Sequence, residues 1–249
     1  MEIKKVVVIG SGTMGSGIAA HLCNANIPVT LLDLKTEIST QARDKIHKSR
    51  PPLLLDKSKI NNIKVGNILD NFDEVKEADW VVEAVVERID IKKTLYSQID
   101  TLRKPGALVS SNTSSIPLKI LTEDMTKEMK EVFCITHFFN PVRFMRLLEL
   151  VRGEQTRQDV MDTLDVFCET MLGKGVVPCL DTPGFLANRV GVFAIQCALH
   201  KAFKYNLSPI EADAFFGRLR GLPKNGVFGL YDLIGIDLMA DVAKSLENI

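Results

Sequence analysis

The sequence predicts an α/β protein in which a mostly parallel, doubly wound sheet is followed by a small all-helical domain. Up to residue 180, short β-branched runs alternate with helical stretches, which is typical of a parallel sheet with helices on both faces. After the segment Asp181-Thr182-Pro183-Gly184, helical patterns continue without strand signals. We therefore expect one domain over residues 1–182 and a second over residues 183–249.

Short apolar runs mark the expected strands of the first domain. Runs such as VVVIG and DWVVEAVV are apolar almost without interruption, which favours strands covered on both faces. The expected strands are Ile3–Ile9, Val29–Asp33, Trp80–Glu83, Leu108–Ser111, Val132–Thr136, Met145–Val151 and Val176–Cys179. Between them, the expected helices are Met14–Ala25, Ile91–Arg103 and Asp159–Leu172.

Helix-start signals follow in the second domain. Thr182 is suited to cap a helix that has Pro183 at its first position, and the apolar pattern of Phe185–Asn206 predicts a long helix. Ser208-Pro209-Ile210-Glu211 spells a capping box with proline at the first helical position, so a second helix begins there. Further helices are expected at Phe228–Ile234 and Asp237–Leu246.

Charge and composition narrow the class of protein. Lys and Arg number 31, as do Asp and Glu, and this balance argues against a nucleic-acid-binding role. The 5 cysteines form no C-x-x-C pair, which argues against a disulfide framework or a zinc site. No apolar run reaches the length of a membrane span, and a strand begins too early for a signal peptide. We therefore expect a cytoplasmic protein that binds no membrane and no metal.

A glycine-rich turn follows the first expected strand. Gly10-Ser11-Gly12-Thr13-Met14-Gly15 matches G-x-G-x-x-G between a strand and a helix. The first glycine of this motif permits a tight turn, the second lets the backbone approach a pyrophosphate, and the third lets the helix pack on the sheet. Asp33 ends the second strand 18 residues after Gly15, where a carboxylate binds the adenosine ribose. Because Asp33 would repel the 2′-phosphate of NADP, the sequence predicts a Rossmann-type domain that binds NAD.

Two polar residues in apolar runs suggest a catalytic pair. His137 directly follows the run Val132–Thr136, at the sheet edge where open α/β sheets bind ligands. A single histidine there would more often be a structural or surface residue. Glu149 lies within Leu147–Val151, where an ionised carboxylate is costly unless it is paired. Together they suggest a dyad in which Glu149 fixes the imidazole tautomer and stabilises its protonated form.

Two further polar features stay open at this point. Ser111-Asn112-Thr113-Ser114-Ser115 follows another strand at the same edge, where small polar residues also serve as helix caps or turn formers. Asn188 is polar on an otherwise apolar helix. It is either a hydrogen-bonding residue at the domain interface or a substrate contact.

Several segments, taken in order, resemble a known family. GSGTMGSGIAAHL, VVEAVVE, SSNTSS, THFFNPV, LLELV and DTPGFLANR are similar to the 3-hydroxyacyl-CoA dehydrogenases of fatty-acid β-oxidation. The resemblance runs from about Lys4 to at least Asp241. It implies reversible oxidation of an (S)-3-hydroxyacyl-CoA to the 3-ketoacyl-CoA, with NAD as the hydride acceptor.

The resemblance also implies roles for single residues. His137 would be the catalytic base and acid, and Glu149 its partner. Ser114 and Asn188 would contact the reacting substrate oxygens. The residues implied around the cofactor and the reaction centre are Glu87, Lys92, Asn112 and Asn140, the first two near the nicotinamide half of NAD.

A basic stretch lies in the region that forms a helical arm in this family, at about residues 34–64. Its basic side chains are Lys35, Arg43, Lys45, Lys48, Arg50, Lys57, Lys59 and Lys64. They are either a solvated helical face or a surface that suits the CoA phosphates. The stretch is shorter than in the short single-function enzymes, and Pro51-Pro52 breaks any long helix.

The C-terminal segment departs from the short enzymes of the family. GLPKNGVFGLYDLIGIDLMADV is more similar to the dehydrogenase part of multifunctional β-oxidation proteins, so we expect an incomplete helical domain. The implied partners are an acyl-CoA substrate and either a second copy or the remainder of such a protein. Two other functions stay open: an NAD-dependent dehydrogenase of a free hydroxy acid or sugar acid, and a non-catalytic NAD-binding fragment.

Overall fold

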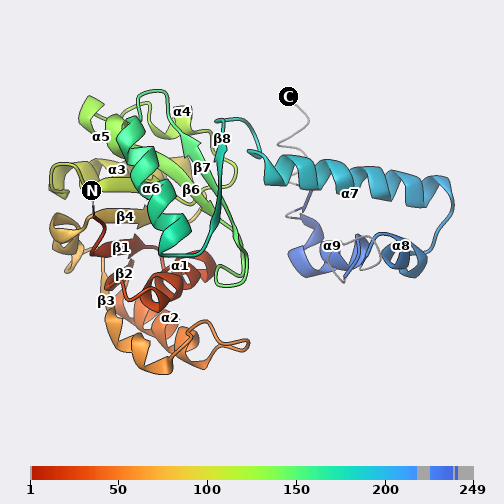
Figure 1. Ribbon diagram of the computed structural model, residues 1–249, viewed down its shortest axis with the longest axis horizontal. Coiled ribbons are helices and arrows are strands. Elements are labelled where there is room, and N and C mark those ends of the chain that lie inside the picture. The colour runs from red at the N-terminus through yellow and green to blue at the C-terminus, as the bar shows by residue number, and fades with distance from the viewer. Residues whose placement is uncertain (1, 218–224, 238, 241–249) are drawn as a thin grey trace. The chain divides into compact units, whose positions relative to one another are not determined.

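The computed structural model describes residues 2–217, 225–237 and 239–240 (Figure 1). The chain divides into two compact units, Met1–Asp181 and Thr182–Ile249. The expected helix Asp237–Leu246 falls mostly outside the described residues.

The first unit contains an eight-stranded sheet of order β3-β2-β1-β4-β5-β6-β7-β8. Its strands are β1 (Val6–Ile9), β2 (Val29–Asp33), β3 (Ile63–Asn67), β4 (Trp80–Glu83), β5 (Leu108–Ser111), β6 (Phe133–Phe138), β7 (Leu147–Arg152) and β8 (Gly175–Cys179). All neighbours are parallel except β6 and β7. The predicted mostly parallel, doubly wound sheet is therefore confirmed. Strand β3 was not predicted, because an edge strand is only partly buried and its sequence, IKVGN, gives a weak apolar signal.

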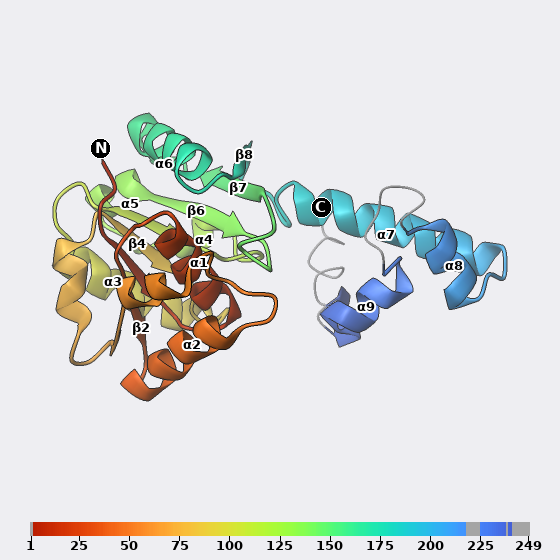
Figure 2. The same ribbon diagram turned by 60° about the horizontal axis from the view of Figure 1, so that its bottom comes forward.

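Helices cover both faces of this sheet. The crossover helices α1 (Thr13–Asn24) and α2 (Thr36–Lys48) lie on the same face as α6 (Gln158–Thr170), and α3 (Ile89–Leu102) lies on the opposite face (Figures 1 and 2). On the α6 face, the rings of Trp80 and Phe167 have centroids 6.0 Å apart. On the α3 face, the centroids of Tyr96 and Phe133 are 4.9 Å apart. The shorter elements are η1 (Lys57–Asn62), η2 (Phe72–Glu77), α4 (Leu118–Leu121) and α5 (Lys127–Val132).

The strand register brings polar side chains onto the α3 face. Glu83 is paired with Ser111 across β4 and β5, and His137 is paired with Glu149 across β6 and β7. Directly opposed residues share a face of a sheet, and so do residues two apart in one strand. Since Ser111 is also paired with Ile135, all four polar side chains point to the same face at the carboxyl ends of β4–β6.

The second unit is helical as predicted, with α7 (Ala187–Lys204), α8 (Pro209–Phe215) and α9 (Phe228–Ile234). The predicted capping box is confirmed at α8, where Ser208 and Glu211 cap each other's backbone N–H groups. The expectation that Thr182 caps a helix is wrong. Gly184 and Phe185 have positive φ values of 71° and 44°, which a right-handed helix cannot accommodate, and α7 begins only at Ala187.

Within the described residues, we find no helix that combines the length and the apolar character needed to cross a membrane.

His21 of α1 is a partly buried titratable group in the first unit. Its Nε2 lies 2.9 Å from the carbonyl oxygen of Leu172. Burial, followed by repulsion from the nearby Lys174, lowers the pKa of His21 to about 4. The fold therefore favours the neutral imidazole.

We expect His21 to make the protein less stable in acid. Because its pKa is lower in the folded state than the usual 6.5, the unfolded chain binds the proton first as the pH falls. The free energy of unfolding is therefore highest above pH 6.5 and decreases towards pH 4. His21→Gln keeps an N–H group for Leu172 but cannot titrate, so urea unfolding at pH 7 and pH 4.5 should show a decrease smaller by about 2 kcal/mol.

His47→Gln is the matched control, since His47 is exposed in the last turn of α2. It should leave the decrease unchanged. A decrease of wild-type size in His21→Gln would contradict the assignment to His21.

Candidate active site

The glycine-rich turn has the close contacts that its motif requires. Gly10 has a φ of 98°, and a Cβ atom there would lie 2.4 Å from the carbonyl oxygen of Ala84. A Cβ at Gly15 would lie 1.8 Å from the carbonyl oxygen of Gly10, so only glycine lets α1 approach the turn. At Gly12, in contrast, a Cβ would meet no protein atom within 4 Å. The turn therefore has no room for a side chain at Gly10 or Gly15, where it packs against the protein, whereas the backbone at Gly12 faces open space.

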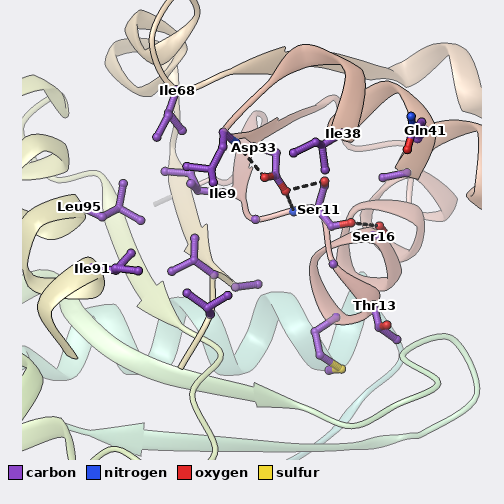
Figure 3. A pocket seen from close by; sticks show the side chains of 18 of the residues that line it. Ile9, Ser11, Thr13, Ser16, Asp33, Ile38, Gln41, Ile68, Ile91 and Leu95 are labelled. Carbon is purple, nitrogen blue, oxygen red and sulfur yellow. Dashed lines mark hydrogen bonds between the residues drawn. The ribbon is translucent and has the colours of Figure 1, made fainter. Parts of the chain in front are cut away.

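A cavity of about 1110 Å³ lies beside this turn (Figure 3). Its volume is slightly above the usual range of about 300–1,000 Å³ for small-molecule and cofactor sites. Of the predicted cofactor residues, Gly10, Gly12, Thr13, Met14 and Asp33 line it, and Gly15 is buried beneath it. The open backbone at Gly12 and the N–H groups at the start of α1 suit a pyrophosphate. The residues present therefore fit a dinucleotide.

The Asp33 carboxylate is held in place on the cavity wall. Oδ2 accepts hydrogen bonds from the backbone N–H and the hydroxyl of Ser11, at 2.7 and 2.6 Å, and Oδ1 accepts one from Leu34 N–H at 2.7 Å (Figure 3). Ser11 was not predicted as a site residue. Its hydroxyl lies inside the G-x-G turn, and this feature of the sequence could have indicated a hydrogen-bond donor to the Asp33 carboxylate.

His137 and Glu149 form the predicted dyad. Nδ1 of His137 lies 2.7 Å from Oε2 of Glu149, and the two residues are 6% and 0% exposed. With Nδ1 donating to the carboxylate, Nε2 is the basic nitrogen of the neutral ring. The ring centroid of Phe139 lies 4.4 Å from that of His137. The imidazole is therefore held in one tautomer and packed in one orientation.

Hydrogen bonds hold the loop between β6 and β7 in place at two points. Asn112 Oδ1 accepts a hydrogen bond of 2.9 Å from Phe138 N–H, which ties the end of β5 to the end of β6. Lys174, a buried lysine that was not predicted, donates to the carbonyl oxygens of Val142 and Met145. Burial lowers the pKa of Lys174 to about 8. Asn140 lies in this loop and precedes Pro141 in a cis peptide bond.

Glu87 and Lys92 are close together, and the place near the nicotinamide half of NAD that the resemblance implies for both stays a prediction. Lys92 Nζ lies 3.2 Å from Glu87 Oε2 and 2.7 Å from Glu83 Oε1. Glu83 was missed, although a glutamate within the apolar run DWVVEAVV is the same signal that identified Glu149. Glu87 also accepts hydrogen bonds from the hydroxyls of Thr113 and Ser115. These two residues flank Ser114, so Glu87 fastens the turn that presents Ser114 after β5.

Asn188 lies in the first turn of α7, in the second unit. Its contact with substrate stays a prediction.

The basic stretch is partly accounted for by contacts within the protein. As expected, no long helix forms, because α2 ends at Lys48 before Pro51 and Pro52. Lys59 donates to the carbonyl oxygen of Asn24 and Lys64 pairs with Glu74, which favours structural roles for both. Lys45 lines the cavity.

The sequence matches two family descriptions that together cover nearly the whole chain. These are "3-hydroxyacyl-CoA dehydrogenase, NAD binding domain" over residues 5–182 and "3-hydroxyacyl-CoA dehydrogenase, C-terminal domain" over residues 184–248. The match to the first covers the unit that contains the cavity and the dyad.

Individual proteins show the same similarity. The chain is 43% identical over 252 residues to a Rickettsia prowazekii protein named as a fatty acid oxidation complex trifunctional enzyme, covering 98% of the chain and 35% of that protein. It thus spans about a third of that relative's length. It is 38% identical to a Deinococcus radiodurans protein named as a 3-hydroxyacyl-CoA dehydrogenase, covering 100% and 74%.

A solved structure agrees in fold. The (S)-3-hydroxybutyryl-CoA dehydrogenase of Ralstonia eutropha has a TM-score of 0.86 and 30% identity, with 99% of this chain and 88% of that chain covered. The chain therefore belongs to the 3-hydroxyacyl-CoA dehydrogenase family of oxidoreductases, and NAD is its cofactor.

Proposed function

We propose that the protein catalyses the reversible oxidation of (S)-3-hydroxyacyl-CoA to 3-ketoacyl-CoA in fatty-acid β-oxidation. The observation that carries this proposal is the buried hydrogen bond of 2.7 Å between His137 and Glu149. This hydrogen bond lies at the edge formed by the carboxyl ends of the parallel strands, and the nucleotide-binding turn follows β1 at the same edge. A histidine that gains a proton during the reaction needs a nearby negative charge, and Glu149 supplies it.

The roles of the side chains follow from this arrangement. Nε2 of His137 takes the proton of the 3-hydroxyl group, and the resulting cation is stabilised by Glu149. NAD, when bound, accepts the hydride from C3. Ser114 and Asn188 hold the substrate oxygen so that the carbon and the nicotinamide meet in reactive geometry. Asn112 and Asn140 position the loops around the reaction centre.

The CoA moiety and the protein partners belong to the same proposal. The basic residues of the 34–64 region that have no structural role are available for the CoA phosphates. Relatives named as fatty acid oxidation complex proteins support a partner role in which this chain works beside other β-oxidation activities. A homodimer is the alternative, and a cytoplasmic location stays a prediction.

His137→Gln should reduce kcat/KM for acetoacetyl-CoA reduction by about a thousandfold, because the proton donor and acceptor is lost. The dissociation constant of NADH should change by less than about threefold, because the dyad binds the substrate rather than the dinucleotide. Steady-state kinetics and NADH fluorescence titration measure the two quantities. His47→Gln is the control, and near-wild-type turnover by His137→Gln would refute the assigned base.

The substrate class is decided by comparing acetoacetyl-CoA with free acetoacetate in NADH-dependent reduction. Only the CoA ester should be reduced at an appreciable rate, because the basic region would contribute binding energy only to the ester. Equal efficiency on the two would favour a dehydrogenase of free hydroxy acids. Tight NADH binding without any turnover would favour a non-catalytic NAD-binding protein.

Asp33→Asn should weaken NADH binding by about tenfold, because a neutral amide accepts weaker hydrogen bonds from ribose hydroxyls than a carboxylate does. It should also raise NADPH affinity, because the charge that repels the 2′-phosphate is gone. Binding titrations with both cofactors measure the change. Glu37→Gln, at an exposed acid in the first turn of α2, should change neither affinity. An unaltered NADH preference in Asp33→Asn would show that Asp33 does not select the cofactor.

A further inference from the structure

Glu83 is a fully buried carboxylate surrounded by donors. Its Oε1 accepts from Val85 N–H and from Lys92 Nζ, both at 2.7 Å. Its Oε2 accepts from the Tyr96 hydroxyl at 2.5 Å and from the Ser111 hydroxyl at 2.6 Å. Burial, followed by the charge of Glu83, raises the pKa of Tyr96 well above 10, so the phenol stays a donor. Four donors therefore surround this one carboxylate.

Lys92 joins Glu83 to a second carboxylate. Its side chain is 1% exposed, and its ammonium group lies between Glu83 and Glu87. Burial alone would raise the pKa of Glu87, but attraction to Lys92 and hydrogen bonds from Thr113, Lys92 and Ser115 outweigh it and lower the pKa. Glu87 is therefore ionised at neutral pH.

The cluster of Glu83, Lys92 and Glu87 contains two negative charges and one positive charge. Its net charge is therefore −1. The nearby guanidinium of Arg88 is paired with Asp90 at 2.5 Å, so it does not cancel this charge. Because Glu83 and Lys92 are buried and hydrogen-bonded, the charges cannot turn away and are weakly screened by solvent.

The cluster adjoins the nucleotide cavity on the side opposite to Asp33. Val85, whose N–H binds Glu83, lines that cavity with Ala84 and Val86. The strand order reverses between β1 and β4, and a dinucleotide lies across such a reversal. Since Asp33 marks the adenosine half at β2, the other half lies along the ends of β4–β6. The nicotinamide half of a bound NAD would therefore lie near the ends of the strands that hold this cluster.

We propose that Glu83, Lys92 and Glu87 form a negative site that binds the oxidised, cationic nicotinamide in preference to the reduced, neutral ring. Glu83 acts as a positioning residue that holds Lys92. Its negative charge gives the cluster its net charge of −1, because Lys92 and Glu87 alone would balance each other. A lower affinity for NADH lets the reduced cofactor leave after each oxidation. The proposal requires NAD binding alone and is independent of the substrate.

The test is the ratio of the dissociation constants of NAD⁺ and NADH, measured on the full chain by calorimetry and by NADH fluorescence. Glu83→Gln removes one negative charge, and the ratio Kd(NAD⁺)/Kd(NADH) should rise by about tenfold, as expected for a charge within several ångströms of the ring. Glu87→Gln removes the same charge from a partly exposed carboxylate and should raise the ratio in the same direction. Tyr96→Phe removes a donor to Glu83 but no charge, so it should change the ratio by less than about twofold.

A folded Glu83→Gln protein with an unchanged ratio would overturn the proposal. So would a Tyr96→Phe protein whose ratio rises as much as that of Glu83→Gln, because the effect would then follow from packing and not from charge. If circular dichroism shows that Glu83→Gln does not fold, Glu87→Gln decides, and an unchanged ratio in that variant overturns the proposal.

Discussion

The hydrogen bond between His137 and Glu149 joins two nearly inaccessible side chains across β6 and β7. An unpaired carboxylate in this position would cost several kcal/mol, so Glu149 is compatible with the core only when it faces the imidazole. A slip of one residue in the register would turn Glu149 to the opposite face of the sheet. The antiparallel pairing of β7 with β6 is therefore inseparable from the geometry of the dyad.

Glu83 is a second buried carboxylate, on β4, and it too is compatible with the core only when its oxygens are paired or hydrogen-bonded. Its four hydrogen bonds reach the turn after β4, helix α3 and the end of β5. The two buried carboxylates lie on one face of the sheet, and each joins neighbouring elements at the carboxyl ends of β4–β6. The polar network that orders this edge thus also places the carboxylates of Glu83 and Glu149 there.

Much of the first unit could be predicted because its signals are local. Strands β2, β4 and β5 were predicted with their observed bounds, since continuous apolar runs end there at turn or polar residues. Strand β3 was missed because it is an edge strand with a glycine and an exposed lysine. The prediction of a helix start at Thr182 was wrong because the backbone at Gly184 and Phe185 is left-handed. This conformation belongs to a turn that the helix propensities of the residues do not indicate.

The sequence by itself determined the nucleotide-binding turn and its aspartate, because a strand, three spaced glycines, a helix and a strand-end carboxylate are read within about thirty residues. It also determined that Glu149 needed a partner. The sequence also suggested His137 as that partner. Only the tertiary structure decided which partners Glu83 takes, namely Ser111, Lys92 and Tyr96. Strand order and register set those pairings, because they bring together residues that lie on separate elements of the chain.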